Sequence, residues 1–142
     1  MRLVKDVLEG KGREVWVVGP DQTVFDALNI MAEHEIGALL VRRDDEVIGI
    51  VSERDYARKV ILQGKSSQST PVGEIMTSEL FRVGPRHSVD ECMALMTAGH
   101  VRHLPVFDND KLVGIVSIGD LVKAVMEDQK FTIEQLENYI AR

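Results

Sequence analysis

The sequence has few of the features that build cross-linked, zinc-bound or membrane-spanning proteins. It contains one cysteine, Cys92, which excludes an internal disulfide and any multi-cysteine zinc site. No apolar run approaches the roughly 20 residues of a membrane span, and no signal-peptide pattern opens the sequence. These absences predict a cytoplasmic protein that is held together by an apolar core.

An excess of basic charge is also missing. The 142 residues include 17 lysines and arginines against 23 acidic residues, giving a net charge of −6. Nucleic acids and anionic membranes attract basic surfaces, so the composition argues against both as partners. The apolar fraction of 44% is enough for the core of one domain, or of two small halves that share it.

What the sequence does contain is an internal repeat. Gly-Ile-Val-Ser at residues 49–52 returns at residues 114–117, and each copy is followed by an aspartate, Asp55 or Asp120. Each motif therefore reads Gly-x-x-Ser-x-x-Asp at the end of an apolar strand and before a helical segment. This order places a hydroxyl and a carboxylate at a helix N-terminus, where backbone N–H groups favour an anion.

The repeat extends well beyond this motif. The two copies align without gaps at an offset of 65 over residues 18–60 and 83–125. Further upstream, residues 6–8 match residues 74–76 at an offset of 68, so the first copy carries three extra residues near 11–13. Matches that are spread through strands and helices are poorly explained by chance.

Each copy is predicted to fold as β-α-β-β-α after a short leading segment. Gly-Pro ends the first strand of each copy, and Thr23 or Ser88 can cap the helix that follows. Apolar residues then recur at helical spacing, followed by two strands and a last helix. The expected strands are 15–18, 38–41, 47–51, 80–83, 103–106 and 112–116, and the last helices are 56–62 and 121–127.

Two segments lie outside the copies. Residues 63–71 are polar with Gly, Ser and Pro, which is typical of a linker. In residues 129–142, Thr132 and Gln135 resemble a capping box, which predicts a separate tail helix. Its apolar side chains Ile133, Leu136 and Ile140 share one face, which predicts that it packs on the domain or on a second chain.

The sequence resembles a tandem pair of CBS domains, named for cystathionine β-synthase. The resemblance rests on the segment Val-Gly-Glu-Ile-Met-Thr at residues 72–77 and on the two closing Gly-Ile-Val-Ser-x-x-Asp motifs. It implies an α/β (α+β) fold with two repeats related by a pseudo-two-fold axis, plus a C-terminal helix. The expected organisation is repeat 1 at 1–62, a linker at 63–71, repeat 2 at 72–128 and the C-terminal helix at 129–142.

The resemblance also implies a function. CBS pairs bind adenosyl ligands in clefts between their halves, so AMP is the first candidate, and ADP, ATP, NAD and S-adenosylmethionine are alternatives. These are regulatory ligands, and no catalytic cofactor is expected. Two pairs associate in the family into a disc-shaped homodimer. The sequence shows no attached enzyme or channel and so is similar to the stand-alone CBS-pair proteins. We therefore expect the protein to signal energy or redox state to a protein partner.

The family's binding residues transfer onto this sequence through its motifs. The motif aspartates, Asp55 and Asp120, would take ribose hydroxyls, and Ser52 and Ser117 would lie near a phosphate. The candidates for binding a phosphate are the basic residues Arg54, Arg102 and His103. The candidates for contacting the adenine ring are Met76, Thr77, Ala38, Leu39, Leu104 and Pro105. More cations surround the first motif, so the Asp55 site is expected to hold the more phosphate-rich ligand.

Simpler interpretations of these residues remain open. Ser-x-x-Asp before a helix is close to a capping box, which needs no ligand. Arg102 and His103 can be surface residues, and the wall residues can be plain strand core. No metal site is expected, and no catalytic triad or phosphate-binding glycine loop supports an enzyme. The alternative function is a structural dimerisation module whose clefts hold no physiological ligand.

Overall fold

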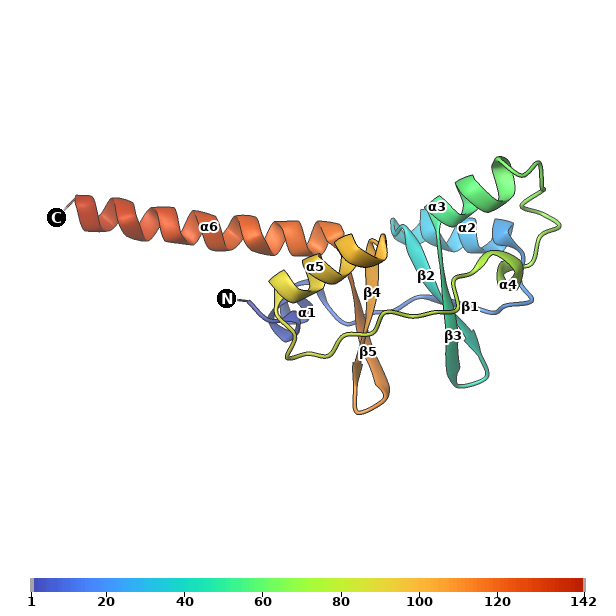
Figure 1. The fold of residues 1–142 in the computed structure, drawn as a ribbon, viewed down its shortest axis with the longest axis horizontal. Helices are drawn as coiled ribbons and strands as arrows, with labels where there is room; N and C mark the ends of the chain where they lie inside the picture. The colour runs from blue at the N-terminus through green and yellow to red at the C-terminus, as the bar shows by residue number, and fades with distance from the viewer. Residues whose placement is uncertain (1, 142) are drawn as a thin grey trace. The chain divides into compact units, whose positions relative to one another are not determined.

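A computed structural model describes residues 2–141 and has a mixed α/β architecture (Figure 1). The chain forms two compact units. One unit holds Val15–Leu80, and the other joins the start of the chain, up to Glu14, to the part from Phe81 onward.

The unit Val15–Leu80 contains a three-stranded sheet in the order β1-β2-β3. The first strand is parallel to the second, which pairs antiparallel with the third, placing Leu40 opposite Ile50. Its elements are β1 (Val17–Val18), α2 (Val24–His34), β2 (Ala38–Arg43), β3 (Glu46–Ser52), α3 (Glu53–Tyr56), the π-helical turn η1 (Ala57–Ile61) and α4 (Val72–Ile75).

The other unit repeats this plan around the antiparallel hairpin β4-β5. The register places Pro105 opposite Ile115, the positions that correspond to Leu40 and Ile50 in the first hairpin. Its elements are α1 (Val4–Lys11), α5 (Val89–Gly99), β4 (His103–Asp108), β5 (Lys111–Ser117) and α6 (Ile118–Ile140).

Helix starts agree with the sequence where a capping residue was identified. Thr23 and Ser88 each accept a hydrogen bond from the amide three residues later, and that later residue, Asp26 or Glu91, accepts one in return. The two helices therefore begin at Val24 and Val89, as the capping prediction requires.

Several expected elements differ in the structure. The strand expected at 15–18 covers only Val17–Val18, and the helix expected from residue 121 begins at Ile118. The strand expected at 80–83 is a single bridge between Val83 and Val106. The helix expected from residue 56 begins at Glu53. The tail is no separate helix, because α6 runs unbroken from Ile118 to Ile140, and the Thr132 hydroxyl donates to the Asp128 carbonyl, one turn back, instead of capping a new helix.

The leading segment of each copy packs in the unit of the other copy. In one unit, the Val4 amide donates to the His87 carbonyl at 2.8 Å. In the other, the Val72 amide donates to the Gln22 carbonyl, also at 2.8 Å. Each compact unit therefore contains the leading segment of the other repeat. The domain boundaries expected from the sequence, at residues 62 and 72, remain predictions.

A glycine in each hairpin lies under the exchanged segment. A Cβ at Gly114 would lie 2.8 Å from a Leu8 methyl group, and one at Gly49 would lie 2.7 Å from the Met76 sulfur and 3.0 Å from the Thr77 carbonyl oxygen. Leu8 is 1% exposed and belongs to the core of its unit. Only a residue without a side chain permits these close approaches.

A Gly114→Ala variant tests this packing. We expect it to lower the free energy of unfolding by about 1–3 kcal/mol, because the added methyl group displaces Leu8 from a filled core. Gly10→Ala is the matched control, since nothing lies within 4 Å of a Cβ there and alanine favours the helix by about 1 kcal/mol. Denaturant unfolding measures both, and a Gly114→Ala protein as stable as the unaltered chain would contradict the packing of α1 on β5.

Candidate functional site

Both Ser-x-x-Asp motifs form capping boxes where a strand passes directly into a helix. Ser52 ends β3 with an extended backbone, its amide donates to Asp55 Oδ2 at 2.9 Å, and the Asp55 amide donates to Ser52 Oγ at 3.3 Å. Ser117 and Asp120 repeat this arrangement at 2.8 and 3.1 Å. The capping interpretation is thus confirmed, and each box fixes a carboxylate at the mouth of a helix.

Asp55 lies beside a lysine of the next turn. Lys59 Nζ is 3.4 Å from Asp55 Oδ1 and donates to the Ile75 carbonyl, at the end of α4, at 2.8 Å. The Asp55 side chain is 16% exposed. The structure therefore turns the Lys59 side chain toward the aspartate and the α4 carbonyl.

Asp120 is held more tightly, and by a residue from the start of the chain. Lys11 Nζ donates to Asp120 Oδ2 at 2.6 Å and to the Ile115 carbonyl at 3.0 Å. The Asp120 side chain is 22% exposed. The lysine therefore shares the carboxylate oxygen that the Ser117 amide already uses.

The position of Lys11 follows from the length of α1. α4 ends at Ile75, so Thr77 is extended and exchanges two backbone hydrogen bonds with Ile50, at 2.9 and 3.0 Å. α1 continues one turn beyond the matching point, and Lys11 is its last residue. Its ammonium group thereby reaches Ile115, the counterpart of Ile50. Lys11 was not predicted as a site residue. The three extra residues of the first copy, near 11–13, are the sequence feature that could have indicated it.

The charges around Asp120 shift two pKa values. Burial raises the pKa of the Asp120 carboxyl, but the hydrogen bonds and charge of Lys11, together with the Ser117 amide, outweigh it and lower the pKa overall. Burial lowers the pKa of His103, and the nearby Lys11 lowers it further against the opposing effect of Asp120. Both effects favour the neutral form of His103, which would offer a ligand an N–H donor rather than a positive charge.

The β4-β5 hairpin carries the other residues of this unit that were predicted to bind a ligand. His103 is half-buried and opposite Ser117, whereas Arg102 is exposed and its carbonyl accepts the Ile118 amide at 2.9 Å. Leu104 is fully buried and Pro105 is buried. Arg102 and His103 therefore flank the start of α6, while Leu104 belongs to the core.

The candidate site residues of the Val15–Leu80 unit are buried or half-buried. Ala38 and Leu39 are 5% and 0% exposed, so they are core residues that could offer a ligand little beyond their backbone groups. Met76, Thr77 and Arg54 are half-buried. The structure brings Met76 and Thr77 against β3, two to three residues before Ser52.

Other reactive or ligating groups are scarce in the described part of the chain. Within residues 2–141, no three histidine, cysteine or acidic side chains gather as a metal site would require. Cys92 is buried, and burial raises the pKa of its thiol to about 11. The helices described there also include none with the length and apolar character of a membrane span.

Comparison with known proteins defines the class of protein. A family model of the CBS domain matches residues 4–61 and 72–127. The chain is 42% identical over 147 aligned positions to the CBS domain-containing protein CBSX3, mitochondrial, of Arabidopsis thaliana, covering 96% of this chain and 71% of the relative. The chain therefore belongs to the CBS-domain family and carries two copies of the domain.

Solved structures agree with this membership. A CBS-domain protein from Burkholderia ambifaria, described as a signal-transduction protein, is 53% identical with a TM-score of 0.88, over 90% of this chain and 96% of that one. The CBS domain pair of protein MJ0100, solved with 5-methylthioadenosine and S-adenosyl-L-methionine, is 25% identical with a TM-score of 0.79, over 90% and 98%. The fold class expected from the sequence is confirmed.

A Lys11→Met variant tests the ion pair at Asp120. We expect the pKa of Asp120 to rise, because a major source of stabilisation for its ionised form is lost. In the unaltered chain this pair stabilises the fold above about pH 3.9, the ordinary aspartate value, and the effect is lost as the pH falls through the lower folded value. Carbon NMR of the carboxyl groups across pH measures the shift.

Lys5→Met is the control for this experiment, since Lys5 is an exposed lysine on the same helix. It should leave the Asp120 titration unchanged. Equal titration curves for Asp120 in the unaltered chain and in Lys11→Met would show that the lysine does not hold the carboxylate in solution.

Proposed function

We propose that this protein is a regulatory sensor that binds an adenosine-containing ligand at its Ser-x-x-Asp motifs and signals energy or redox state. AMP is the first ligand to consider, followed by ADP, ATP, NAD and S-adenosylmethionine. The proposal is supported most directly by one feature that both units share. Each unit fixes one partly exposed aspartate, Asp55 or Asp120, in a capping box beside the edge of a strand.

The chemistry of these aspartates suits a ribose. A carboxylate accepts several hydrogen bonds, and hydrogen bonds to ionised groups are shorter and stronger than those between neutral groups. Asp55 Oδ1 has a lysine no closer than 3.4 Å, so neighbouring hydroxyls could replace that weak contact. The CBS pair of MJ0100 supports the ligand class, because both of the compounds bound to it contain adenosine.

The two sites should differ in affinity. Lys11, 2.6 Å from Asp120, offsets the negative charge of that carboxylate, whereas Lys59 is 3.4 Å from Asp55. The Asp55 carboxylate therefore keeps more of its charge to accept hydrogen bonds from ribose hydroxyls. The half-buried Arg54 also lies beside Asp55. We infer that the Asp55 site binds first and accepts the more phosphate-rich ligand.

Several further properties remain predictions. We infer that the protein is not an enzyme and that it acts through a homodimer and a downstream protein partner. A cytoplasmic location is also a prediction, and the Arabidopsis relative is named as mitochondrial. The alternative function, a dimerisation module without a physiological ligand, makes the opposite prediction in a binding experiment.

Calorimetry with the five ligands and isosteric variants tests the proposal. We expect Asp55→Asn to weaken binding by about 10- to 100-fold, because one charged hydrogen-bond acceptor is lost, and Asp120→Asn to affect a weaker second site. Asp45→Asn, in an exposed hairpin turn, is the control and should bind as the unaltered chain does. No binding of any of the five ligands, or equal binding in all three variants, would reject the proposal in favour of the dimerisation module.

A further inference from the structure

The C-terminal half of α6 is a helix without packing in its own chain. Every residue from Gln129 to Ile140 is exposed, and Figure 1 shows this part of α6 running past α1 and α5. The exposed side chains include Ile133, Leu136 and Ile140 at 54%, 56% and 80%. Twelve residues of helix are only marginally stable alone in water, so this segment needs a partner.

The apolar residues of α6 follow the spacing of a coiled coil. Successive members of one stripe are separated by four, three, four, three and four residues, which is the heptad pattern with a mean repeat of 3.5. The stripe consists of Val122, Met126, Gln129, Ile133, Leu136 and Ile140. We call these six residues the α6 seam. Gln129 is its one polar member.

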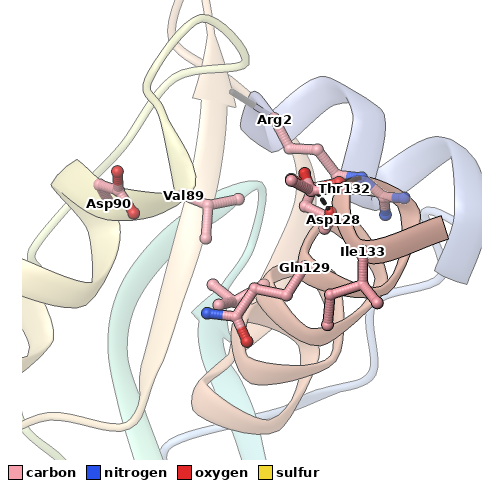
Figure 2. Close-up of a pocket in the computed structure, with 8 residues that line it drawn as sticks. Arg2, Val89, Asp90, Asp128, Gln129, Thr132 and Ile133 are labelled. Carbon is pink, nitrogen blue, oxygen red and sulfur yellow. Dashed lines mark hydrogen bonds and ion pairs between the residues drawn. The ribbon is translucent and has the colours of Figure 1, made fainter. Parts of the chain in front are cut away.

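A groove beside the seam gives a second helix a place to lie. It has a volume of about 490 Å³ and runs between the start of α5 and the middle of α6. Figure 2 shows Gln129 and Ile133 of the seam at this groove, with Val89 of α5 across from them. Arg2 Nε pairs with Asp128 Oδ1 at 2.9 Å in its lining, so charged side chains line the groove beside the apolar Val89 and Ile133.

The charges that flank the seam indicate the partner and its direction. Lys123 and Lys130 come directly after Val122 and Gln129, and Glu137 comes directly after Leu136. In an antiparallel pair of identical helices, Lys123 lies beside Glu137 of the partner subunit, and the same contact forms a second time by symmetry. Lys130 lies beside its own copy at the two-fold axis, so two opposite-charge contacts stand against one like-charge contact. In a parallel pair these residues are about 20 Å apart along the axis, and their charges do not meet.

The antiparallel register also aligns the seam with itself. Met126 then faces Leu136 of the partner subunit, Ile133 faces Gln129 of the partner subunit, and Ile140 faces Val122 of the partner subunit. Every apolar residue of the seam obtains a partner, and the acidic C-terminal end of each helix is placed against a lysine of the other.

We propose that α6 is an assembly element that pairs two copies of this chain through an antiparallel coiled coil along the α6 seam. This contact is separate from the Ser-x-x-Asp sites and does not depend on ligand. It is the contact that holds the two chains of the homodimer together, so its loss should give single chains.

Light scattering with size-exclusion chromatography on the full chain, over a range of concentrations, tests the pairing. We expect Leu136→Glu to halve the mass and to weaken association by about 100-fold or more, because each carboxylate would be buried without a counter-charge. Phe131→Glu is the matched control: Phe131 is 62% exposed on the same segment but lies off the seam, so the mass should not change.

Charge reversal tests the direction. Lys123→Glu should weaken association by placing two glutamates side by side, and Lys123→Glu combined with Glu137→Lys should restore it. A parallel pair would show no such rescue.

Three results would overturn the proposal. If the unaltered chain stays a single copy at all concentrations, the α6 seam does not pair two copies of this chain. Equal effects of Leu136→Glu and Phe131→Glu would make the seam irrelevant to assembly. An unchanged mass in Leu136→Glu would do the same. Ligand binding is measured separately by calorimetry. A chain that stays a single copy would contradict the homodimer inferred above but would leave ligand binding untouched, and absence of ligand binding would leave the pairing untouched.

Discussion

The structure depends on a short helix that packs over a glycine in each β-hairpin. Leu8 of α1 lies over Gly114 in β5, and Met76, just after α4, lies over Gly49 in β3. The β4-β5 hairpin stands alone, and the β2-β3 hairpin has only the two-residue strand β1 beside it. Each hairpin therefore needs the segment that packs on it to bury its apolar face. Because the covering segment comes from the other copy, neither copy forms a complete core from its own contiguous sequence.

The same packing sets the difference between the two candidate sites. Where α4 stops early, the extended chain at Thr77 pairs with the edge of β3 through its backbone. Where α1 continues, the edge of β5 receives a lysine side chain instead, and that lysine also binds Asp120. One additional helical turn thus places a charged side chain where the other unit has a backbone contact. Its ammonium group lowers the pKa of Asp120 against the effect of burial, and it adds to burial in lowering the pKa of His103.

The capping box uses only some of the polar atoms of each Ser-x-x-Asp motif. The box occupies Oδ2 of each aspartate together with the serine hydroxyl. A helix cap is therefore no argument against a binding role, because the second carboxylate oxygen and the partial exposure of Asp55 and Asp120 remain. The cap fixes the carboxylate in one orientation, which reduces the entropy that a ligand must offset on binding.

The sequence alone determined the doubled motif, the family, the capping residues Thr23 and Ser88, and the strands that follow, because these depend on local pattern. It could not determine that residues 80–83 form a single bridge or that α6 continues through Thr132, since both depend on what packs beside the segment. Only the tertiary structure brought Lys11 to Asp120. The two residues are 109 positions apart, and their contact follows from the exchange of leading segments and the length of α1.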